Sequence, residues 1–340
     1  MRILITGGTG FLGRALCRAL LDGGHALTVL SRRPDSVRRL CGAAVTPLAT
    51  LEAWPSEPFD AVVNLAGAPI IDRRWSAARR AVLRASRIEA TERLVAACAR
   101  AGHPPAVLLS ASAIGIYGDR GDDWLDEEAP AADDFLGELC RDWEAAAQAA
   151  RALGTRVCLL RTGLVLHPSG GVLRAMLPAF RLGVGARLGN GRHWQSWIQF
   201  DDWLGLVLHL LADGQAEGAF NLTAPEPVTQ AAFTAALAEA LRRPAWAVAP
   251  AGLLRALLGE RAILLLASQR CTPRRAQAAG YRFRYPRLEF GKLLTPNSQL
   301  LNPHLRSRSI RAEPLRAPSA PRRAADSSKV STSSGSMPGW

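Results

Sequence analysis

The chain has 340 residues, of which 48% are apolar, and this size and composition are typical of a globular protein with a sizeable core. No run of about 18 apolar residues occurs, which excludes a transmembrane helix, and Met1 enters a strand directly, which argues against a signal peptide. The six cysteines are scattered without C-x-x-C or another metal-like spacing, a pattern typical of buried thiols in a reducing compartment. We therefore expect a cytoplasmic protein with no membrane partner and no metal site.

The formal net charge of +13 raises the question of a nucleic-acid partner, but much of that charge lies near the C-terminus. Residues 295–340 hold seven Lys/Arg against Glu313 and Asp326, are rich in Ser and Pro, and show no apolar period. That composition predicts a disordered basic tail, which could be a nonspecific anion-binding arm or simply a solvated segment. Charge alone binds nucleic acids without sequence preference, so we expect no specific nucleic-acid partner.

The first thirty residues predict a strand, a glycine-rich turn, a helix and a second strand. Residues 2–6 (RILIT) and 26–30 (ALTVL) have the pattern of buried strands, and residues 14–21 space their apolar side chains as a helix does. Between the first strand and the helix, the segment 6–13 (TGGTGFLG) has the glycine spacing of a dinucleotide-binding turn. The order of elements around the glycines makes this prediction more specific than the glycines alone.

Each glycine of the turn has its own physical role. Gly7 allows the sharp turn, Gly10 lets a pyrophosphate approach the backbone, and Gly13 lets the helix pack closely on the strand. A diphosphate would lie at the positive helix N-terminus, although the same loop could merely pack a helix. The cofactor contacts expected from this loop are Gly7, Thr9, Gly10, Phe11, Leu12 and Gly13.

The end of the second strand indicates which dinucleotide is bound. A chain that prefers the 2′-hydroxyl of NAD places an acidic residue there, whereas a 2′-phosphate requires a cation. This chain has Ser31-Arg32-Arg33 at that place. Because a guanidinium can form paired hydrogen bonds with a phosphate, the sequence predicts NADP(H), with Ser31 and Arg32 in contact with it.

Residues 61–67 (AVVNLAG) predict the next buried strand, whose C-terminal end faces the cofactor in a sheet of this kind. Leu65, Ala66 and Gly67 are therefore expected to touch the cofactor through backbone groups, the alternative being a plain exit into a loop. A long amphipathic helix is predicted over 75–100. Its expected inward positions are Val82, Ile88, Leu94, Val95 and Cys98. Arg87 near its middle could reach the cofactor phosphates or could be solvated like its other arginines.

Two further strands complete the predicted alternation of strands and helices. They lie at 106–110 and 156–161, and the helix between them begins at Asp133 or Asp134 and runs to residue 153. The first strand leads to Ser112 and Tyr117, whose hydroxyls lie where a substrate oxygen could be bound. The fold class predicted from this order is a doubly wound, Rossmann-type parallel α/β sheet with a small, mostly helical C-terminal substrate domain.

The predicted domains are an NADP-binding domain over 1–165, a substrate and lid region over 166–294, and the tail over 295–340. A later short strand at 219–222 could add to the edge of this sheet. The segment 192–197 concentrates polar and aromatic groups and is expected to belong to the lid. At 200–203, Asp201 or Asp202 is expected to cap a helix, the alternative being a catalytic carboxylate. A final short helix is predicted from Pro273 to Gly280.

Several motifs together resemble the extended and atypical short-chain dehydrogenase/reductases, the superfamily of sugar-nucleotide epimerases. They are 6–13 (TGGTGFLG), 64–67 (NLAG), 110–113 (SASA) before Tyr117-Gly118, and 197–202 (WIQFDD). A second set is similar to the epimerase family proteins of short-chain dehydrogenase/reductase family 39U, which end in a DUF1731-like domain. These are Arg74-Trp75 with Ser86-Arg87, 143–146 (WEAA), 161–166 (RTGLVL), and 269–273 (QRCTP) before Gly280-Tyr281. The resemblance covers residues 1 to about 294.

The resemblance implies an NADP-binding protein, in agreement with the residues at the end of the second strand. The positions that match the family's cofactor contacts are Ser31 and Arg32, Leu65 and Ala66, Arg87, and the main chain near Val165. The resemblance thus favours the cofactor-binding alternative for Arg87.

The catalytic part departs from the superfamily's pattern, because no Tyr-x-x-x-Lys pair is present. Alignment on Trp143-Glu144 puts Leu136 and Cys140 where that pair would lie. Ser112 remains as a candidate catalytic residue, with Tyr117 either an alternative acid or a packed aromatic. Two classes of function stay open: an NADP-dependent oxidoreductase or epimerase with an unknown small-molecule substrate, or a non-catalytic NADPH-binding sensor or assembly factor.

Overall fold

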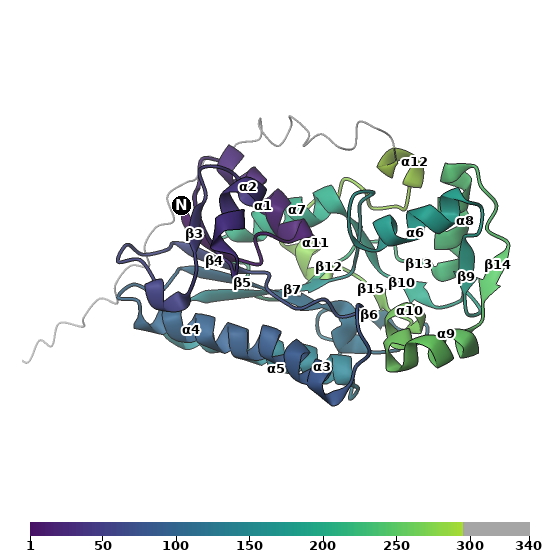
Figure 1. Ribbon diagram of the computed structural model, residues 1–340, viewed down its shortest axis with the longest axis horizontal. Coiled ribbons are helices and arrows are strands. Elements are labelled where there is room, and N and C mark those ends of the chain that lie inside the picture. The colour runs from purple at the N-terminus through teal and green to yellow at the C-terminus, as the bar shows by residue number, and fades with distance from the viewer. Residues whose placement is uncertain (295–340) are drawn as a thin grey trace, which may run out of the picture. The chain divides into compact units, whose positions relative to one another are not determined.

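The structure, a computed structural model, describes residues 1–294, and the predicted basic tail lies outside the described residues. Its central feature is a seven-stranded parallel sheet (Figure 1). From edge to edge the strands are β12 (Gly218–Leu222), β7 (Arg156–Thr162), β5 (Val107–Ala113), β4 (Ala61–Asn64), β1 (Arg2–Thr6), β2 (Ala26–Leu30) and β3 (Thr46–Leu48). The predicted parallel α/β fold is confirmed, and the predicted strands 2–6 and 26–30 have the observed bounds.

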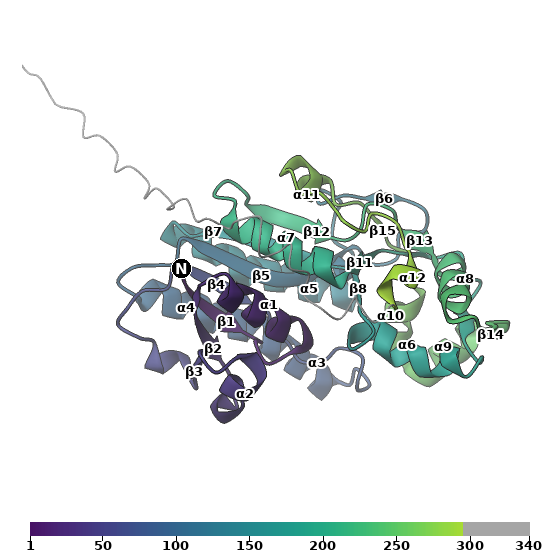
Figure 2. The same ribbon diagram turned by 90° about the horizontal axis from the view of Figure 1, so that it is seen from above.

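Helices cover both faces of the sheet, as Figures 1 and 2 show. Alternate residues of the strands pack against opposite faces. On one face, Ile3 and Ile5 of β1 contribute to a core with α1 (Phe11–Asp22), α2 (Val37–Cys41) and α7 (Phe200–Ala212). On the other face, Leu4 packs in a second core with α4 (Ala90–Arg100) and α5 (Phe135–Gln148). The strands are therefore buried on both sides, which is why they read as continuous apolar runs.

The helix predicted over 75–100 is three consecutive pieces, and this changes which residues face inward. α3 (Ala77–Arg84) is followed by a π-helical turn, Ala85–Glu89, and then by α4. A π turn contains an extra residue, so the inward face moves by one position between α4 and α3. Leu94, Val95 and Cys98 are buried as predicted, but the prediction for Val82 is wrong: Val82 is 48% exposed and Leu83 is buried instead.

Two other predicted boundaries are wrong for local reasons. Neither Asp201 nor Asp202 caps α7; the side chain of Gln199 does so, accepting hydrogen bonds from the backbone N–H groups of both aspartates. The helix after Pro273, α11 (Arg274–Ala278), is not the last, because α12 (Phe290–Leu293) follows it. In addition, β4 ends at Asn64, so residues 65–67 form the loop that leaves the sheet.

The chain beyond β7 combines helices with paired short strands. The remaining helices are α6 (Gly171–Arg181), α8 (Gln230–Leu241), α9 (Ala251–Leu258) and α10 (Ile263–Leu266). The strand pairs are β8 (Leu164–Leu166) with β11 (Trp197–Gln199), β9 (Ala186–Leu188) with β14 (Ala247–Ala249), and β10 (Trp194–Gln195) with β13 (Val228–Thr229). In addition, β15 (Arg270–Cys271) pairs with β6 (Trp124–Leu125), which precedes α5. A separate apolar cluster holds α6, α8 and α12 together. No helix of residues 1–294 is long and apolar enough to cross a bilayer.

Buried carboxylates fasten the C-terminal segments to the sheet layers. The carboxylate of Asp202 in α7 accepts hydrogen bonds from the backbone N–H groups of Arg284 (2.9 Å) and Tyr285 (2.8 Å). It also accepts one from the hydroxyl of Tyr281 at 3.2 Å. Glu127 in the loop before α5 similarly accepts hydrogen bonds from the backbone N–H groups of Asn221 in β12 and Arg275 in α11. Desolvation by burial raises the pKa of both carboxyl groups.

We predict that Asp202→Ala lowers the free energy of unfolding by about 3 kcal/mol, because two buried N–H groups and a hydroxyl lose their acceptor. Chemical denaturation measures this change. Asp133→Ala is the matched control, since the side chain of Asp133 is 99% exposed, and its effect should stay within about 0.5 kcal/mol. An Asp202→Ala variant as stable as this control would show that the C-terminal segment does not depend on the carboxylate.

Candidate functional site

The glycine loop brings the N-terminus of α1 against the exit of β4. Gly7 has φ +69°, and a Cβ at this position would lie 2.6 Å from the carbonyl carbon of Leu65. A Cβ on Gly13 would lie 2.3 Å from the carbonyl oxygen of Gly7. Both positions therefore require glycine, one for its backbone conformation and for contact with β4, the other for contact between helix and loop.

The N-terminus of α1 has no capping side chain. Its N-cap residue is Gly10, and no acidic residue lies in its first turn. The first intrahelical hydrogen bond runs from the backbone N–H of Arg14 to the carbonyl of Gly10. The N–H groups of Phe11, Leu12 and Gly13, together with Thr9 before them, thus form the uncapped positive end of a twelve-residue helix. Such an end is suited to a phosphate or diphosphate.

A buried polar network fixes the loop that follows β4. The hydroxyl of Thr6 donates to the side-chain oxygen of Asn64 at 2.6 Å and accepts a hydrogen bond from the backbone N–H of Ala66 at 3.1 Å. The amide nitrogen of Asn64 donates to the hydroxyls of Thr91 (2.9 Å) and Ser110 (3.1 Å). Since these side chains come from β1, β4, β5 and α4, they hold residues 65–66 at the carboxyl edge of the sheet beside Gly7.

Arg87 lies in the π turn and covers the loop after β4. Its guanidinium donates to the carbonyl of Ala68 at 3.0 Å, and a Cβ on Gly67 would lie 3.3 Å from its Cζ. It also lies over the ring of Trp143, 5.3 Å from the centroid. Among the described residues no carboxylate forms an ion pair with Arg87, and burial lowers its pKa. A partly buried, unpaired cation therefore lies at the same edge of the sheet as the α1 N-terminus.

The residues after β2 supply two more cations. Arg32 and Arg33 are exposed, and neither is in an ion pair within residues 1–294. The hydroxyl of Ser31 accepts a hydrogen bond from the backbone N–H of Arg33 at 3.1 Å, which orders this turn. β2 is the neighbour of β1 in the sheet, so the turn lies beside the glycine loop.

An aromatic cluster lies against the same end of α1. The ring of Phe11 is 5.1 Å from Phe200 and 5.9 Å from His167, and His167 is 4.7 Å from Phe200. His167 directly follows β8, which contains Val165, so the cluster brings the predicted Val165 contact near the glycine loop. Desolvation lowers the pKa of His167, which favours its neutral form.

Ser112 and Tyr117 belong to a buried hydrogen-bond network. The hydroxyl of Ser112 donates to the carboxylate of Glu144 at 2.6 Å. Arg161 donates to both oxygens of that carboxylate at 2.8 Å, a paired and nearly fully buried ion pair. The other terminal nitrogen of Arg161 donates to the hydroxyl of Tyr117 at 3.0 Å. That hydroxyl in turn donates to the side-chain oxygen of Asn221 at 2.7 Å.

The network affects the two candidate catalytic hydroxyls differently. Tyr117 has no exposed surface and both its hydrogen-bonding partners are protein groups, an arrangement that favours the packed-aromatic alternative over an acid. Burial raises its pKa, which makes proton loss less favourable still. Ser112 is 4% exposed, and its hydroxyl donates its hydrogen bond to the carboxylate of Glu144. Leu136 has no ionisable group, and burial in α5 raises the pKa of the Cys140 thiol, so neither offers an alternative acid at the site.

The segment 192–197 lies next to the turn that follows Ser112. The backbone N–H of Gln269 donates to the carbonyl of Trp194, while its side-chain amide donates to the carbonyls of Ile114 and Gly118. The indole N–H of Trp194 donates to Asp122 at 2.7 Å. Gln269 therefore links these two stretches, which are distant in the sequence; a role in substrate binding stays a prediction.

A separate bridge joins the loop after β4 to the C-terminal helices. The guanidinium of Arg261 donates to the carbonyl of Ile71 in this loop at 2.9 Å, and Arg80 in α3, which follows the loop, forms an ion pair with Glu260. The loop that carries Gly67 and Ala68 is thus tied to the segment between α9 and α10.

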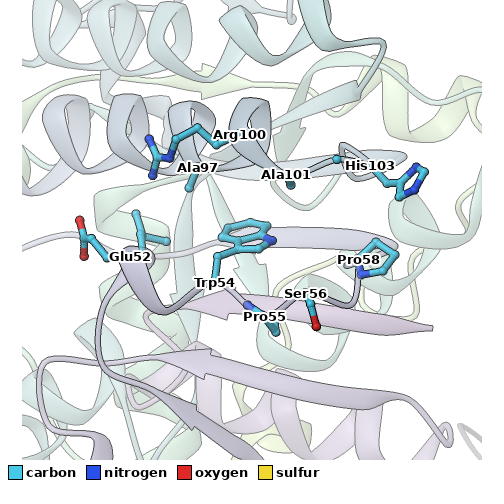
Figure 3. A pocket seen from close by; sticks show the side chains of 11 residues that line it. Glu52, Trp54, Pro55, Ser56, Pro58, Ala97, Arg100, Ala101 and His103 are labelled. Atoms are coloured by element: carbon cyan, nitrogen blue, oxygen red, sulfur yellow. The ribbon is translucent and has the colours of Figure 1, made fainter.

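A cavity of about 600 Å³ lies at the opposite, amino edge of the sheet, as its lining shows (Figure 3). Trp54 and Pro58 precede β4, and Ala101 and His103 precede β5, whereas the glycine loop follows β1. The complete lining is Leu51, Glu52, Trp54, Pro55, Ser56, Pro58, Ala97, Arg100, Ala101, Gly102 and His103. Because parallel sheets bind ligands beyond the carboxyl ends of their strands, this cavity is not the cofactor site.

The sequence analysis did not anticipate the buried ion pair of Glu144 with Arg161, which it named only as parts of family motifs. A signal was present: each is a charged residue within a segment whose other positions predict burial. Buried charges of this kind are paired, and these two have opposite sign. The sequence contains no comparable signal for the π turn in which Arg87 lies.

Comparison with protein families and with known proteins assigns the chain to one family. Residues 3–223 match the NAD dependent epimerase/dehydratase family, and residues 249–290 match DUF1731, a domain of unknown function. Epimerase family protein Mb2239 of Mycobacterium bovis is 42% identical over 285 residues, 83% of this chain and 93% of the relative. The Arabidopsis thaliana protein named Epimerase family protein SDR39U1 homolog, chloroplastic, is 38% identical over 292 residues and covers 84% of each chain.

A solved structure of human epimerase family protein SDR39U1 (isoform 2) with NADPH has the same fold. It superposes with a TM-score of 0.78 at 36% identity, over 86% of this chain and 97% of the human one. The similarity therefore extends through the C-terminal region as well as the sheet. The relatives do not test the cytoplasmic localisation, which stays a prediction.

We predict that Glu144→Ala lowers the free energy of unfolding by about 3–5 kcal/mol, because it leaves the buried guanidinium of Arg161 without its partner. Adding Arg161→Met should recover part of this loss, since the double variant holds no unpaired charge. Urea denaturation of the two single variants and the double variant measures the coupling. Additive losses in the double variant would contradict the ion-pair interpretation.

Proposed function

Because the chain belongs to the NAD dependent epimerase/dehydratase family, we propose that it binds NADP(H) at the carboxyl edge of its sheet and acts as an oxidoreductase on a small carbonyl substrate. When bound, this cofactor supplies or accepts a hydride. The residues that would hold it are the glycine loop residues Gly7, Thr9, Gly10, Phe11, Leu12 and Gly13, then Ser31, Arg32, Leu65, Ala66, Gly67, Arg87 and Val165.

One observation carries this proposal: an uncapped helix N-terminus and three arginines that form no ion pair within residues 1–294 lie at one edge of the sheet. Arg32 and Arg33 follow β2, beside the loop, where a 2′-phosphate would lie in this fold. Arg87 covers the loop after β4. Three unpaired cations beside a helix N-terminus favour an anion with several phosphates, and the relative whose structure was solved with NADPH agrees with that chemistry.

For catalysis, the substrate would lie between the end of β5 and the segment 192–197. In this arrangement Ser112 acts as the hydroxyl beside the substrate oxygen. Glu144 holds the Ser112 proton and is itself oriented by Arg161, so the two charged residues position the hydroxyl rather than touch the substrate.

A second candidate function is NADPH binding without turnover, as in a sensor or assembly factor. The observation that favours it is that the protons of Ser112 and Tyr117 both go to buried protein acceptors, Glu144 and Asn221. Absorbance measurements of NADPH with a panel of carbonyl compounds separate the two candidates. Consumption of NADPH supports the oxidoreductase, and tight binding without consumption supports the sensor.

We predict that NADPH binds at least about tenfold more tightly than NADH, a difference of about 1.4 kcal/mol, and that Arg32→Asp removes or inverts this preference. The physical reason is that the exposed guanidinium of Arg32 would contact the 2′-phosphate of NADPH, which NADH lacks. Isothermal titration calorimetry with both cofactors measures it, with Arg38→Asp, an equal charge change on the exposed face of α2, as the control. Equal affinities in the unmodified protein would contradict the assignment of NADP(H).

If a carbonyl substrate is turned over, Ser112→Ala should lower kcat by about 10²-fold while leaving the NADPH dissociation constant unchanged. Tyr117→Phe should leave kcat within about threefold, because the buried phenol cannot reach a substrate. Steady-state kinetics of both variants provide the comparison. A large loss of kcat in Tyr117→Phe, with stability retained, would return the acid role to Tyr117.

A further inference from the structure

An apolar and basic surface lies in the C-terminal region, at its end distant from the sheet (Figures 1 and 2). Nine large apolar side chains are exposed within residues 1–294, and six of them come from two short segments, 182–184 and 246–257. The six are Leu182, Val184, Trp246, Val248, Leu253 and Leu257. We call this set the C-terminal patch.

Pairing of β9 with β14 joins the two segments. Ala186 pairs with Ala247, so Trp246 lies beside the chain that carries Val184. A Cβ on Gly183 would lie 3.6 Å from the ring of Pro244, so these loops touch. α9 follows β14 directly, and Figures 1 and 2 show both at the end of the C-terminal region distant from the sheet.

The patch projects from the surface. Trp246 is 89% exposed, Leu182 is 79% exposed and Leu257 is 66% exposed. Leu253 and Leu257 are one helical turn apart on α9, and no residue of that helix is buried. Exposed apolar side chains gathered in one place mark a surface that another phase or molecule covers.

The charges around the patch are mainly positive, and the acidic residues next to its segments in the sequence are Glu239 and Glu260, of which Glu260 is paired with Arg80. Residues 181–192 and 241–258 contain six arginines and no acidic residue. Within the described part of the chain, none of these arginines forms an ion pair. The arginines are Arg181, Arg187, Arg192, Arg242, Arg243 and Arg255.

We propose that the C-terminal patch docks the protein on an anionic lipid surface. The apolar side chains would enter the interfacial layer of the membrane, and the arginines would contact the lipid phosphates. Charge complementarity favours this occupant. A second copy meeting the patch across a twofold axis would oppose arginines to arginines. The chain's own segment 295–340 is also basic, with seven Lys/Arg against two acidic residues. A lipid interface accepts separately projecting Trp and Leu side chains flanked by arginine.

Docking of this kind does not need a spanning helix. The expectation of no membrane partner rested on the lack of a long apolar run, which concerns crossing a bilayer rather than lying on one. None of the six apolar patch residues is among the residues proposed to hold NADP(H), so the test needs neither NADPH binding nor turnover.

The test is sedimentation of the full chain with vesicles of phosphatidylcholine and with mixed vesicles of phosphatidylcholine and phosphatidylglycerol. We expect binding to the mixed vesicles only, weakening with added salt. The double variant Trp246→Ser/Leu257→Ser should bind at least about tenfold more weakly, and so should Arg242→Gln/Arg243→Gln. Circular dichroism confirms that the variants fold, as expected for such exposed positions.

Matched controls are Val82→Ser, an exposed apolar residue on α3, and Arg38→Gln/Arg39→Gln, two exposed arginines on α2. Both should bind as the unmodified chain does. Absence of binding to mixed vesicles would overturn the proposal. So would binding that survives the Trp246→Ser/Leu257→Ser changes, since other basic groups would then be responsible. A dimer in analytical ultracentrifugation that this double variant abolishes would assign the patch to a second copy instead.

Discussion

The close approach of α1 to the exit of β4 is the constraint on which the candidate site depends. It exists because Gly7 and Gly13 have no side chain, and a Cβ at either would lie within 2.6 Å of backbone atoms. This contact directs the uncapped helix N-terminus toward the carboxyl edge of the sheet. The arginines after β2 and in the π turn then add positive charge to an edge where Asn64 and Thr6 already fix the backbone. An anion-binding site therefore follows from backbone geometry before any catalytic group is considered.

The chemistry of the site depends on a different interaction, the buried ion pair of Glu144 with Arg161. The alignment on Trp143-Glu144 places Leu136 and Cys140, both buried in α5, where the resembled superfamily has its tyrosine and lysine. One turn further along, the carboxylate of Glu144 accepts hydrogen bonds from the Ser112 hydroxyl and from the Arg161 guanidinium. A buried pair of this kind costs desolvation, so its presence next to the serine is consistent with a positioning role as well as a structural one.

The sequence predicted local features well, because they depend on local physical signals. The strands of the first thirty residues and their glycine turn follow from apolar periodicity and backbone preference. Val82 was placed on the wrong face because a single extra residue in the π turn has no periodic signature. Gln199 was missed as a cap since aspartate is the commoner residue there. Pairings such as Asp202 with Arg284, 82 residues apart, depend on tertiary contacts that no local pattern specifies.

The central claim, a dinucleotide site at the carboxyl edge of the sheet, is tested most directly by hydrogen–deuterium exchange with and without saturating NADPH. The claim predicts slower exchange in residues 7–13, 31–33 and 65–68 and around Arg87. Exchange in residues 51–58 and 97–103, which line the cavity at the amino edge, should not change. Protection of the amino-edge cavity with no change in the glycine loop would contradict the account.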